Sequence, residues 1–348
     1  MVSFFLRWQG ENALSGRAGK ELSTMLVPVL LFLLGFALLI KGGDWFVDGA
    51  TGLAHRFHLP ELLIGATVVS IGTTLPEVMV SAQAAFQQNS GISYGNAIGS
   101  VICNTSLIAA LTVAIRPGKV NPKSLKLPVV SFFLAAVVYA LIAYTTGEFL
   151  RWQGIMLLCM FACYMAVTVL HMKKHPEAQE AEAGEEEAAK ETALWQEILG
   201  LVAGAAAIAV GARLLVDNGT LIAQALGVPD SVIGLTMVAL GTSLPELVTA
   251  VTSLIKGHSA LSLGNVIGAN LFNIVLVSGA AITISPFAIP AEKTLAGMNA
   301  SLLVDLPVMF AVMLILCVPA LLKGKLSRWQ GVLLLCMYVG FTAFQFLV

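Results

Sequence analysis

Long apolar stretches alternate with short polar connections along almost the whole chain. Most of these stretches have about 20 residues, the length a helix needs to cross about 30 Å of hydrocarbon. The pattern therefore predicts an all-α membrane protein with about ten transmembrane helices. The ten stretches lie at about 26–50, 60–86, 92–114, 127–146, 152–171, 195–224, 229–255, 260–284, 301–322 and 328–347.

Two segments depart from this alternation. Residues 1–24 are polar, contain Gly and Ser, and lack the order of regions that marks a signal peptide. We expect a polar N-terminal tail there, with Met25 as an alternative first residue. Residues 172–193 are rich in glutamate and alanine, which favours a solvated acidic linker. This linker separates a first half at 25–171 from a second half at 194–348.

The composition agrees with a lipid environment. Hydrophobic residues make up 57% of the chain and charged residues only 11%, whereas a soluble domain has about 25% charged residues. The net charge of -1 gives no field that would attract nucleic acid. The five cysteines lie inside apolar stretches without metal-ligand spacing, so we interpret them as packing residues and expect no cofactor.

The two halves carry the same residues at positions 169 apart. Leu75-Pro76-Glu77 recurs as Leu244-Pro245-Glu246, and Gly95-Asn96 recurs as Gly264-Asn265. Such internal similarity marks a duplication. Because each half has five crossings, an odd number, the second half enters the membrane from the opposite side. The sequence therefore predicts two inverted five-helix repeats whose matching segments meet near the middle of the bilayer.

The duplicated Leu-Pro-Glu motif predicts a distorted helix in each half. Pro76 and Pro245 have no N–H, and their rings clash with the carbonyl four residues earlier. A glycine at that earlier position leaves room for the distortion. The carbonyls near Thr73 and Thr242 then lose helical partners, which a membrane tolerates only where the carbonyl meets protein, water or an ion.

A glutamate follows each of these prolines. A charge at bilayer depth costs at least about 2.5–3.5 kcal/mol, so Glu77 and Glu246 are candidate functional residues. A single buried glutamate beside a proline kink is commonly structural, but two symmetry-related copies favour a site. Two carboxylates and displaced carbonyls form the hard, oxygen-only environment that Ca²⁺ prefers. Thr73 and Thr242 each share a helix face with the glutamate four residues later.

The neighbouring Gly-Asn motifs supply further oxygen atoms. Asn104 and Asn273 occupy matching positions, and their amide oxygens would complete a coordination shell without added charge. Asn96 and Asn265 are weaker candidates, because Gly and Asn in membrane helices also serve packing and interhelical hydrogen bonds. Other intramembrane charges are interpreted first as structural pairs. These charges are Asp44, Asp48, Arg213 and Asp217.

The distribution of Lys and Arg predicts the orientation. Loops on the linker side hold twelve basic residues, and the opposite loops hold two, or five with the tail. This places the linker in the cytoplasm and both termini outside. The twelve are Arg56, Arg116, Lys119, Lys123, Lys126, Lys173, Lys174, Lys190, Lys256, Lys323, Lys325 and Arg328. The motif Arg-Trp-Gln-Gly, which starts at Arg7, Arg151 and Arg328, indicates interfacial tryptophans beside extended arginines.

The paired Gly-Thr-Thr/Ser-Leu-Pro-Glu and Gly-Asn-x-Ile-Gly blocks resemble the alpha repeats of the sodium/calcium exchanger family in the cation/calcium antiporter superfamily. With the central acidic loop, the resemblance covers nearly the whole chain. It implies a ten-helix inverted-repeat fold, with Ca²⁺ held by Glu77, Glu246 and the carbonyls of Thr73 and Thr242. Flanking Na⁺ sites are implied at Thr74, Ser243, Ser100 and Ser70. This chain departs from the family at Asn273, where Asp is frequent, and at Ala239, Ala269 and Val101.

The expected function is export of Ca²⁺ in exchange for Na⁺ by alternating access, in the plasma (inner) membrane. The expected partners are small cations and the lipid bilayer, and the oligomeric state stays open. A Ca²⁺/H⁺ antiporter is the nearest alternative, since protons compete for the same carboxylates and Asn273 leaves the counter-ion open. A passive cation channel is a third possibility. We do not expect an enzyme, because no nucleophile–base pair or metal triad stands out.

Overall fold

The computed structural model describes residues 2–174, 193–226, 239–290, 294–295 and 297–347. Its side chains are described over the narrower ranges 25–171, 193–226, 241–290, 294–295 and 297–345. The predicted acidic linker at 172–193 lies almost entirely outside the described residues, as does the first part of the apolar stretch predicted at 229–255.

The first half forms a series of long helices that agree closely with the predicted stretches. Two of them contain π-helical turns, labelled η. The elements are α1 (Val2–Arg56), α2 (Glu61–Ile64), η1 (Gly65–Val69), α3 (Ser70–Phe86), α4 (Ser90–Cys103), η2 (Asn104–Ala109), α5 (Ala110–Ile115), α6 (Pro122–Thr146) and α7 (Arg151–Lys174). The helix α1 begins at Val2, so the backbone of residues 2–24 continues this helix where we expected a polar tail.

The second half repeats this order. Its elements are α9 (Leu194–Ala225), α11 (Ala239–Thr242), α12 (Leu244–Lys256), α13 (Ser259–Phe272), η4 (Asn273–Val277), α14 (Ser278–Ile284), η5 (Ser301–Asp305), α15 (Leu306–Lys323) and α16 (Arg328–Leu347). Within the described residues, eight helices are long and apolar enough to span a membrane. The all-α membrane fold predicted from the sequence is confirmed.

Short strands join the two halves at the end of the bundle opposite the linker. The strand β1 (Glu148–Phe149) pairs antiparallel with β2 (Phe287–Ala288), and β3 (Thr294–Leu295) pairs with β4 (Met298–Asn299). At the other end, a single antiparallel bridge joins Lys119 to Lys325. The β1–β2 pair and the Lys119–Lys325 bridge each join a segment of the first half to a segment of the second half.

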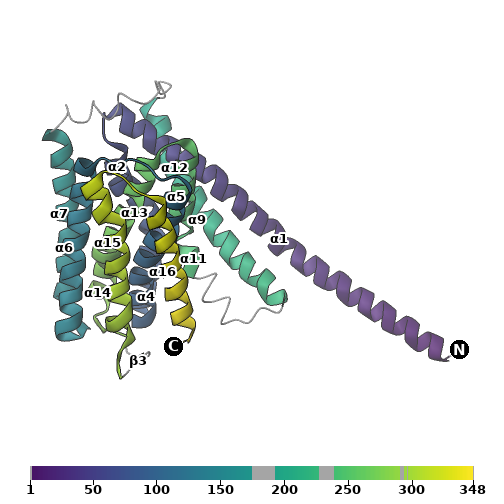
Figure 1. Cartoon of the computed structure of the whole chain (residues 1–348). Coiled ribbons are helices and arrows are strands. Elements are labelled where there is room, and N and C mark those ends of the chain that lie inside the picture. Colours follow the sequence, from purple (N-terminus) through teal and green to yellow (C-terminus); the bar gives the residue numbers. More distant parts are fainter. Residues whose placement is uncertain (1, 175–192, 227–238, 291–293, 296, 348) are drawn as a thin grey trace.

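The helices α1 and α9 lie side by side and form a pair at the edge of the bundle (Figure 1). Glycines bring their backbones into contact. A Cβ at Gly35 would lie 2.8 Å from the Gly211 carbonyl oxygen, and one at Gly42 would lie 3.0 Å from the Gly204 carbonyl oxygen. Small residues are the usual means of close helix packing in membranes, where apolar burial adds little.

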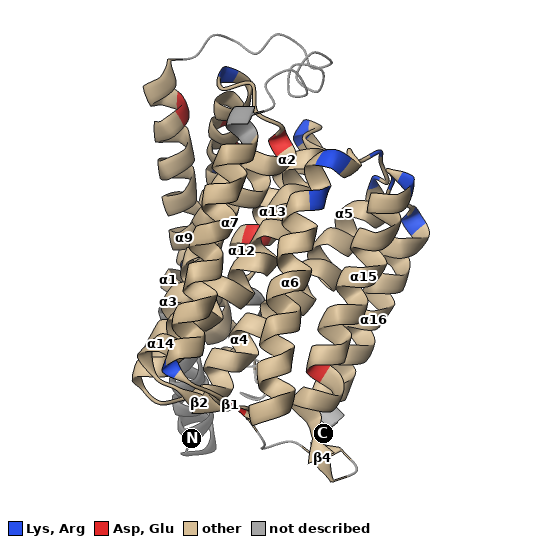
Figure 2. Ribbon diagram, turned by 90° about the vertical axis from the view of Figure 1, so that its left-hand side faces the viewer, with Lys and Arg blue, Asp and Glu red and all other residues tan. Residues whose placement is uncertain are grey.

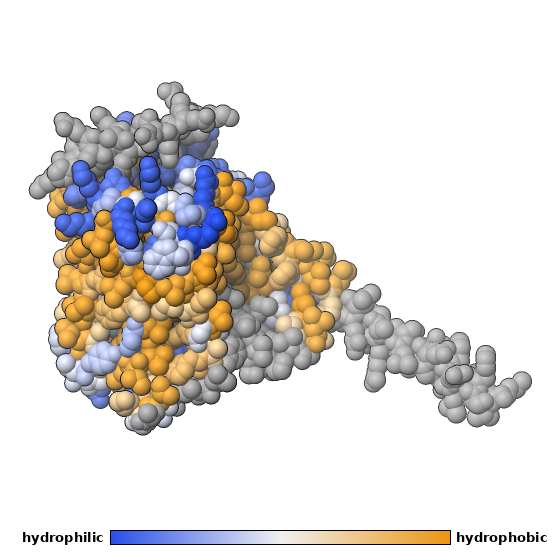
Figure 3. Space-filling view, viewed as in Figure 1, coloured by the Kyte–Doolittle hydropathy of each residue, from blue (hydrophilic) through white to orange (hydrophobic). Residues whose placement is uncertain are grey.

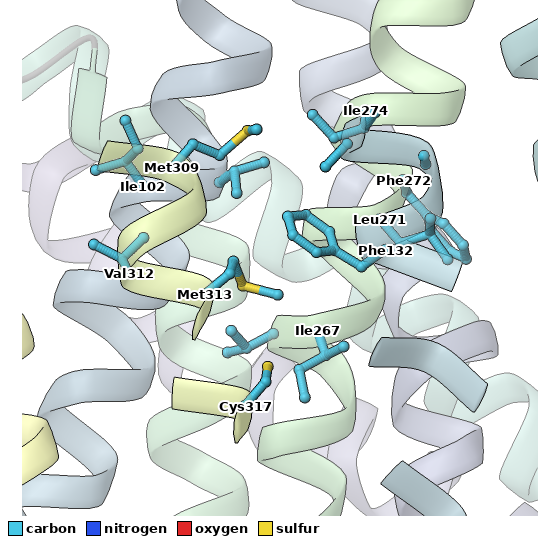
Figure 4. Close-up of a cluster of buried hydrophobic side chains, with 14 of the residues drawn as sticks. Ile102, Phe132, Ile267, Leu271, Phe272, Ile274, Met309, Val312, Met313 and Cys317 are labelled. Carbon is cyan, nitrogen blue, oxygen red and sulfur yellow. The ribbon is translucent and has the colours of Figure 1, made fainter. Parts of the chain in front are cut away.

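The apolar core lies between the helices of both halves. Figure 4 shows Ile102, Phe132, Phe272 and Met313, from α4, α6, α13 and α15, among the members of one cluster of buried apolar side chains. All four side chains are almost completely buried. This packing fixes α4 and α13, the two helices that carry the candidate asparagines, against a rigid surface.

The Arg-Trp-Gln-Gly motifs cross-link the halves. Arg151 on α7 donates to the Ile284 carbonyl at the end of α14, and Arg328 on α16 donates to the Ala114 carbonyl near the end of α5. The exposed carbonyls at a helix C-terminus attract such cations. The sequence predicted extended arginines beside exposed tryptophans; the structure adds these contacts. The motif's glutamines accept bonds from backbone N–H groups at Leu150 and Ser327. The copy at Arg7 lies outside the described side chains.

Charged residues are distributed unequally between the two ends of the bundle. Figure 2 shows Lys and Arg gathered at the end where α2 begins, whereas few lie at the opposite end, near β1 and β4. The helix α16 runs toward that opposite end. Between the two ends the surface is mostly apolar, as the broad hydrophobic belt in Figure 3 shows. A belt of this kind fits the hydrocarbon layer of a membrane.

Candidate ion-binding site

The two proline kinks meet in the structure, as the duplicated sequence predicts. Pro76 and Pro245 line one small cavity of about 10 Å³, together with Gly72 and Thr73. The other lining residues, including Phe46, come from the α1–α9 pair. Motifs that are 169 residues apart in the chain therefore share one place, beneath the paired helices α1 and α9.

The two kinks differ in their backbone. The helix α3 continues through Pro76, whereas the second kink interrupts the helix at Ser243, between α11 and α12. Ser243 has φ -90° and ψ 4°, and Pro245 lies in the first turn of α12, as its second residue, where a missing N–H costs nothing. The glycine of each motif admits a neighbour from the paired helices: a Cβ at Gly72 would lie 3.0 Å from the Phe46 ring.

Glu77 and Glu246 are both completely buried. The carboxylate of Glu77 is close enough to that of Glu246 for a Coulombic interaction. Among the described residues, neither oxygen of Glu77 has a hydrogen-bond partner, and Oε2 of Glu246 also has none. Oε1 of Glu246 accepts a long bond of 3.5 Å from Thr74. Two buried carboxylates with so few partners require a cation or protons for compensation.

Asn104 and Asn273 are also completely buried, and no atom of either side-chain amide has a hydrogen-bond partner in the part of the chain that the structure describes. Each begins a π-helical turn, Asn104 in η2 and Asn273 in η4. Such turns occur frequently at functional sites, because the extra residue leaves backbone and side-chain groups outside the regular helix. Sequence reasoning selected both asparagines but missed the π-helical turns, for which the sequence carries no clear signal.

The remaining predicted residues divide into two groups. Ser243 is buried and its hydroxyl has no hydrogen-bonded oxygen or nitrogen partner among the described residues, while Ser100 is 4% exposed and Thr242 is half-buried at the end of α11. The side chain of Ser243 contacts Cys103, which lies next to Asn104 on α4. These positions, together with the glutamates, leave several oxygen atoms available to a ligand.

Ser70 and Thr73 instead face helix α13. The Ser70 hydroxyl lies 2.7 Å from the Gly65 carbonyl oxygen and 3.0 Å from the Asn265 carbonyl oxygen. The Thr73 hydroxyl donates to Oδ1 of Asn265 at 3.1 Å. Ser70 therefore helps to hold α3 against α13. The family resemblance implied a different role for it, as a Na⁺ ligand. Asn265, a weak candidate by sequence, becomes a direct neighbour of the site.

The other intramembrane charges form ion pairs, which confirms their structural interpretation. Lys256 on α12 lies 2.6 Å from Asp48 and 3.5 Å from Asp44 on α1. Arg213 lies 3.5 Å from Asp217 on α9. The Lys256 pairs join the paired helices to the central helices near the linker end, whereas the Arg213 pair lies within one helix.

The donor set is rich in oxygen and poor in other ligand types. Within the described residues, no group of three or more His, Cys, Asp or Glu could hold a metal ion. The site has two carboxylates, and its other available donors are amide and hydroxyl oxygens. Hard cations such as Ca²⁺ and Na⁺ prefer this chemistry. A larger cavity of about 430 Å³ opens near the linker end, but neither Glu77 nor Glu246 lines it.

Comparison with known proteins shows the family to which the chain belongs. The family model described as "Sodium/calcium exchanger protein" matches residues 27–170 and 197–347. The chain belongs to the sodium/calcium exchanger family. Membership in this exchanger family supports cation/calcium antiport as the activity, and the family is one of transporters.

Several relatives of this exchanger match over nearly their whole length. The sodium/calcium exchanger MaX1 of Methanosarcina acetivorans is 32% identical, over 92% of this chain and 99% of its own. An uncharacterized membrane protein of Methanocaldococcus jannaschii is 35% identical, over 90% of this chain and 97% of its own. Among solved structures, the sodium-calcium exchanger NCX_Mj matches with a TM-score of 0.74 and 34% identity, over 90% of this chain and 97% of the other.

Proposed function

We propose that this exchanger exports Ca²⁺ in exchange for Na⁺, by alternating access to a site built on Glu77 and Glu246. The proposal is supported by two completely buried carboxylates from opposite halves that lie close enough to interact electrostatically, and three of their four oxygens have no hydrogen-bond partner among the described residues. A divalent cation would neutralise both charges at once. The buried amides of Asn104 and Asn273 would add uncharged oxygen ligands.

The carbonyls of Thr73 and Thr242 are proposed as further Ca²⁺ ligands, next to the kinks. The proposed Na⁺ ligands are the hydroxyls of Thr74, Ser243, Ser100 and Ser70. Among these, Thr74 has the most direct support, because its hydroxyl already contacts the Glu246 carboxylate. Ser70 has the least, because its hydroxyl is bonded to backbone carbonyls.

The charge of the site gives a reason for obligatory exchange. Two like charges in a low dielectric repel each other and lose hydration, so an empty site that faces neither solution is unfavourable. Binding of Ca²⁺, Na⁺ or protons removes this penalty. The conformational change would therefore proceed only when the site is occupied, which couples the movement of one ion to the return of another.

The paired helices α1 and α9 are proposed to slide over the central helices during the cycle. The glycine-rich contact between them supports movement as one body. Phe46 of α1 lies against Gly72 at the first kink, and Val216 of α9 lies against Gly241 at the second. Sliding would thus open one side of the site while closing the other. The ion pairs of Lys256 with α1 would restrain this motion.

The orientation follows from the unequal charge distribution. We place the basic end of the bundle and the acidic linker in the cytoplasm, and both termini outside, in the plasma (inner) membrane. This orientation would let Na⁺ entry drive Ca²⁺ out of the cell. If one net positive charge enters in each cycle, the membrane potential contributes about 2.3 kcal/mol per 100 mV.

A Ca²⁺/H⁺ antiporter remains the second candidate. The observation that favours it is Asn273, which leaves the site with two carboxylates and so with two places where protons can replace one Ca²⁺. Na⁺ and H⁺ coupling use the same residues and differ in which monovalent ion offsets the charge.

The decisive experiment is Ca²⁺ flux in proteoliposomes under separately imposed Na⁺ and pH gradients. We expect uptake that requires an outward Na⁺ gradient and persists at equal pH on both sides. Uptake that follows the pH gradient and ignores Na⁺ would favour the proton antiporter. Uptake with no counter-ion gradient would indicate a channel. Liposomes containing the Glu77→Gln variant serve as the matched control.

A further inference from the structure

Most buried threonines in these helices form the same type of hydrogen bond within their own helix, whereas Thr73 forms a different one. In five of them the hydroxyl donates to the carbonyl four residues earlier, as expected for a threonine in an apolar helix. These five are Thr51, Thr67, Thr105, Thr168 and Thr249. Thr73 instead donates to the side chain of Asn265 on a helix of the other half. This hydroxyl is therefore held by a specific partner across the repeat interface.

The chemistry of that partner fixes the direction of the bond. Oδ1 of Asn265 is an acceptor only, so the proton between it and Thr73 belongs to the threonine hydroxyl. The same hydroxyl also reaches the carboxylate of Glu246. A hydroxyl has one proton and two lone pairs. It cannot donate that proton to Glu246 while it donates to Asn265.

The direction in which the Thr73 hydroxyl donates its proton matters when a cation binds at the glutamates. Next to a cation, the Thr73 hydroxyl must point its lone pairs at the ion and its proton elsewhere. Oδ1 of Asn265, 3.1 Å away on the α13 side, is the acceptor that the structure provides for this proton. With no such acceptor, the proton would turn toward the carboxylate or the ion and weaken binding.

Asn265 is itself held firmly in place. Added Cβ atoms at Gly264 and Gly268 would overlap the Leu62 carbonyl oxygen and the Ser70 hydroxyl, so α13 lies directly against α2 and α3. The Ser70 hydroxyl also lies 3.0 Å from the Asn265 carbonyl oxygen. Asn265 is completely buried. Its side-chain Oδ1 lies 3.3 Å from the Ser70 hydroxyl as well as 3.1 Å from that of Thr73, so two neighbours on α3 locate this acceptor.

We propose that Asn265 is a positioning residue that accepts the Thr73 hydroxyl proton and thereby turns the oxygen lone pairs of Thr73 toward the transported cation. The inference rests on the proposed function, since it assumes that the cation binds between Glu77 and Glu246. In this proposal Asn265 acts on the ion only by orienting the Thr73 hydroxyl and does not contact the ion itself.

The equivalent residue of the first half has a different role. Asn96 uses its amide Nδ2 as a donor, to the Glu77 carbonyl at 3.1 Å and to the Ser81 hydroxyl at 2.8 Å. It therefore holds the backbone of α3, and among the described residues no threonine donates to it. The proposed proton-accepting role is accordingly assigned to Asn265 alone.

The test is a double-mutant cycle on the full-length protein in proteoliposomes. The variants are Asn265→Leu, which removes the acceptor at similar volume, Asn265→Asp, which retains it, Thr73→Val, and Asn265→Leu combined with Thr73→Val. Initial rates of Ca²⁺ uptake over a range of Ca²⁺ concentrations give KM and maximal rate separately. Asn218→Leu on α9 is the matched control, because among the described residues that buried amide bonds to the Leu214 carbonyl of its own helix.

We expect Asn265→Leu to raise the KM for Ca²⁺ by about tenfold with a maximal rate within about twofold of wild type, as loss of one oriented ligand predicts. Asn265→Asp should not raise KM. Thr73→Val should match Asn265→Leu, and the double variant should lose no more than either alone. Asn218→Leu should leave KM unchanged.

Three outcomes would overturn the inference: an unchanged KM in Asn265→Leu, an equal loss in Asn265→Asp, or additive losses in the double variant. If Asn265→Leu does not fold, as judged by size-exclusion profile, Asn265→Asp and Thr73→Val decide alone. In that case a raised KM in Asn265→Asp, or an unchanged KM in Thr73→Val, contradicts the inference. Absence of Ca²⁺ flux in the wild type would instead refute the proposed function.

Discussion

The hydroxyl oxygen of Thr74 lies 3.5 Å from Oε1 of Glu246, although the two residues are 172 positions apart in the chain. This contact joins the kink of the first half to the carboxylate of the second. Its length shows a site whose groups are near one another without being fully bonded, as expected where a cation supplies the missing interactions. The predictions below follow from this incomplete bonding and from the packing that surrounds it.

Replacement of either central glutamate should stop transport while leaving the fold intact. We expect Glu77→Gln and Glu246→Gln each to reduce Ca²⁺ exchange by at least about 100-fold, since each removes one of two charges that hold a divalent ion. The temperature of unfolding in detergent should stay equal or rise, because a buried charge is lost. Glu148→Gln, at an exposed position in β1, is the control and should transport normally. Exchange at the wild-type rate in either central variant would refute the site.

Acidification should weaken Ca²⁺ binding. Ca²⁺ binds the ionised carboxylates, and protonation of either glutamate removes a charge from the site, so protons and Ca²⁺ compete. With equal pH on both sides of the membrane, we expect the KM for Ca²⁺ to fall as pH rises from 6 to 8. Measurement of initial Na⁺-driven uptake at several pH values checks this. A KM that does not change with pH, or that increases with it, would contradict the competition.

The crossing of α2 and α13 should not tolerate an added methyl group. A Cβ at Gly264 would overlap the Leu62 carbonyl oxygen, and overpacking of this kind costs about 1–3 kcal/mol. We therefore expect Gly264→Ala to lower the unfolding temperature by several degrees. At Gly340, on α16, no described atom lies within 4 Å of an added Cβ. Gly340→Ala should leave stability unchanged or slightly raised, and equal effects of the two changes would contradict the packing.

The ion pair between Arg56 and Glu197 should contribute more to stability than the pair on α9. Arg56 donates two hydrogen bonds, of 2.8 and 3.0 Å, to a carboxylate that is only 6% exposed. Loss of one partner of a buried pair costs about 3 kcal/mol or more. We expect Arg56→Met to lower the unfolding temperature clearly.

The comparison for that prediction is Arg213→Met. Arg213 and Asp217 are 84% and 63% exposed at a separation of 3.5 Å, and exposed pairs contribute less than about 1 kcal/mol. Thermal unfolding of both variants in the same detergent should show little change for Arg213→Met. A larger loss there than for Arg56→Met would refute this ranking of the two pairs.

Most of the fold could be predicted from the sequence because lipid imposes a simple rule. A membrane-spanning chain must satisfy its backbone within helices, so apolar stretches of sufficient length identify the helices. The main difference concerns residues 2–24, whose backbone continues α1. Polar residues there gave no apolar signal, but a helix that has already formed extends at little cost.

The approach of Glu77 to Glu246 was likewise expected from the sequence, and the structure places the two carboxylates close enough to interact electrostatically. A duplicated motif in halves with an odd number of crossings is expected to approach its copy from the opposite side of the membrane. The identity of the candidate ligands follows from residue chemistry at those positions.

Only the tertiary structure decided which hydrogen-bond partners the hydroxyl and amide side chains have. It turned Ser70 toward α13, placed Asn265 beside Thr73, and started π-helical turns at Asn104 and Asn273. These choices depend on contacts between segments about 170–195 residues apart, where glycines set the distance between backbones. Local sequence patterns carry no information about such contacts, because hydrogen-bond partners are selected by packing after the helices have formed.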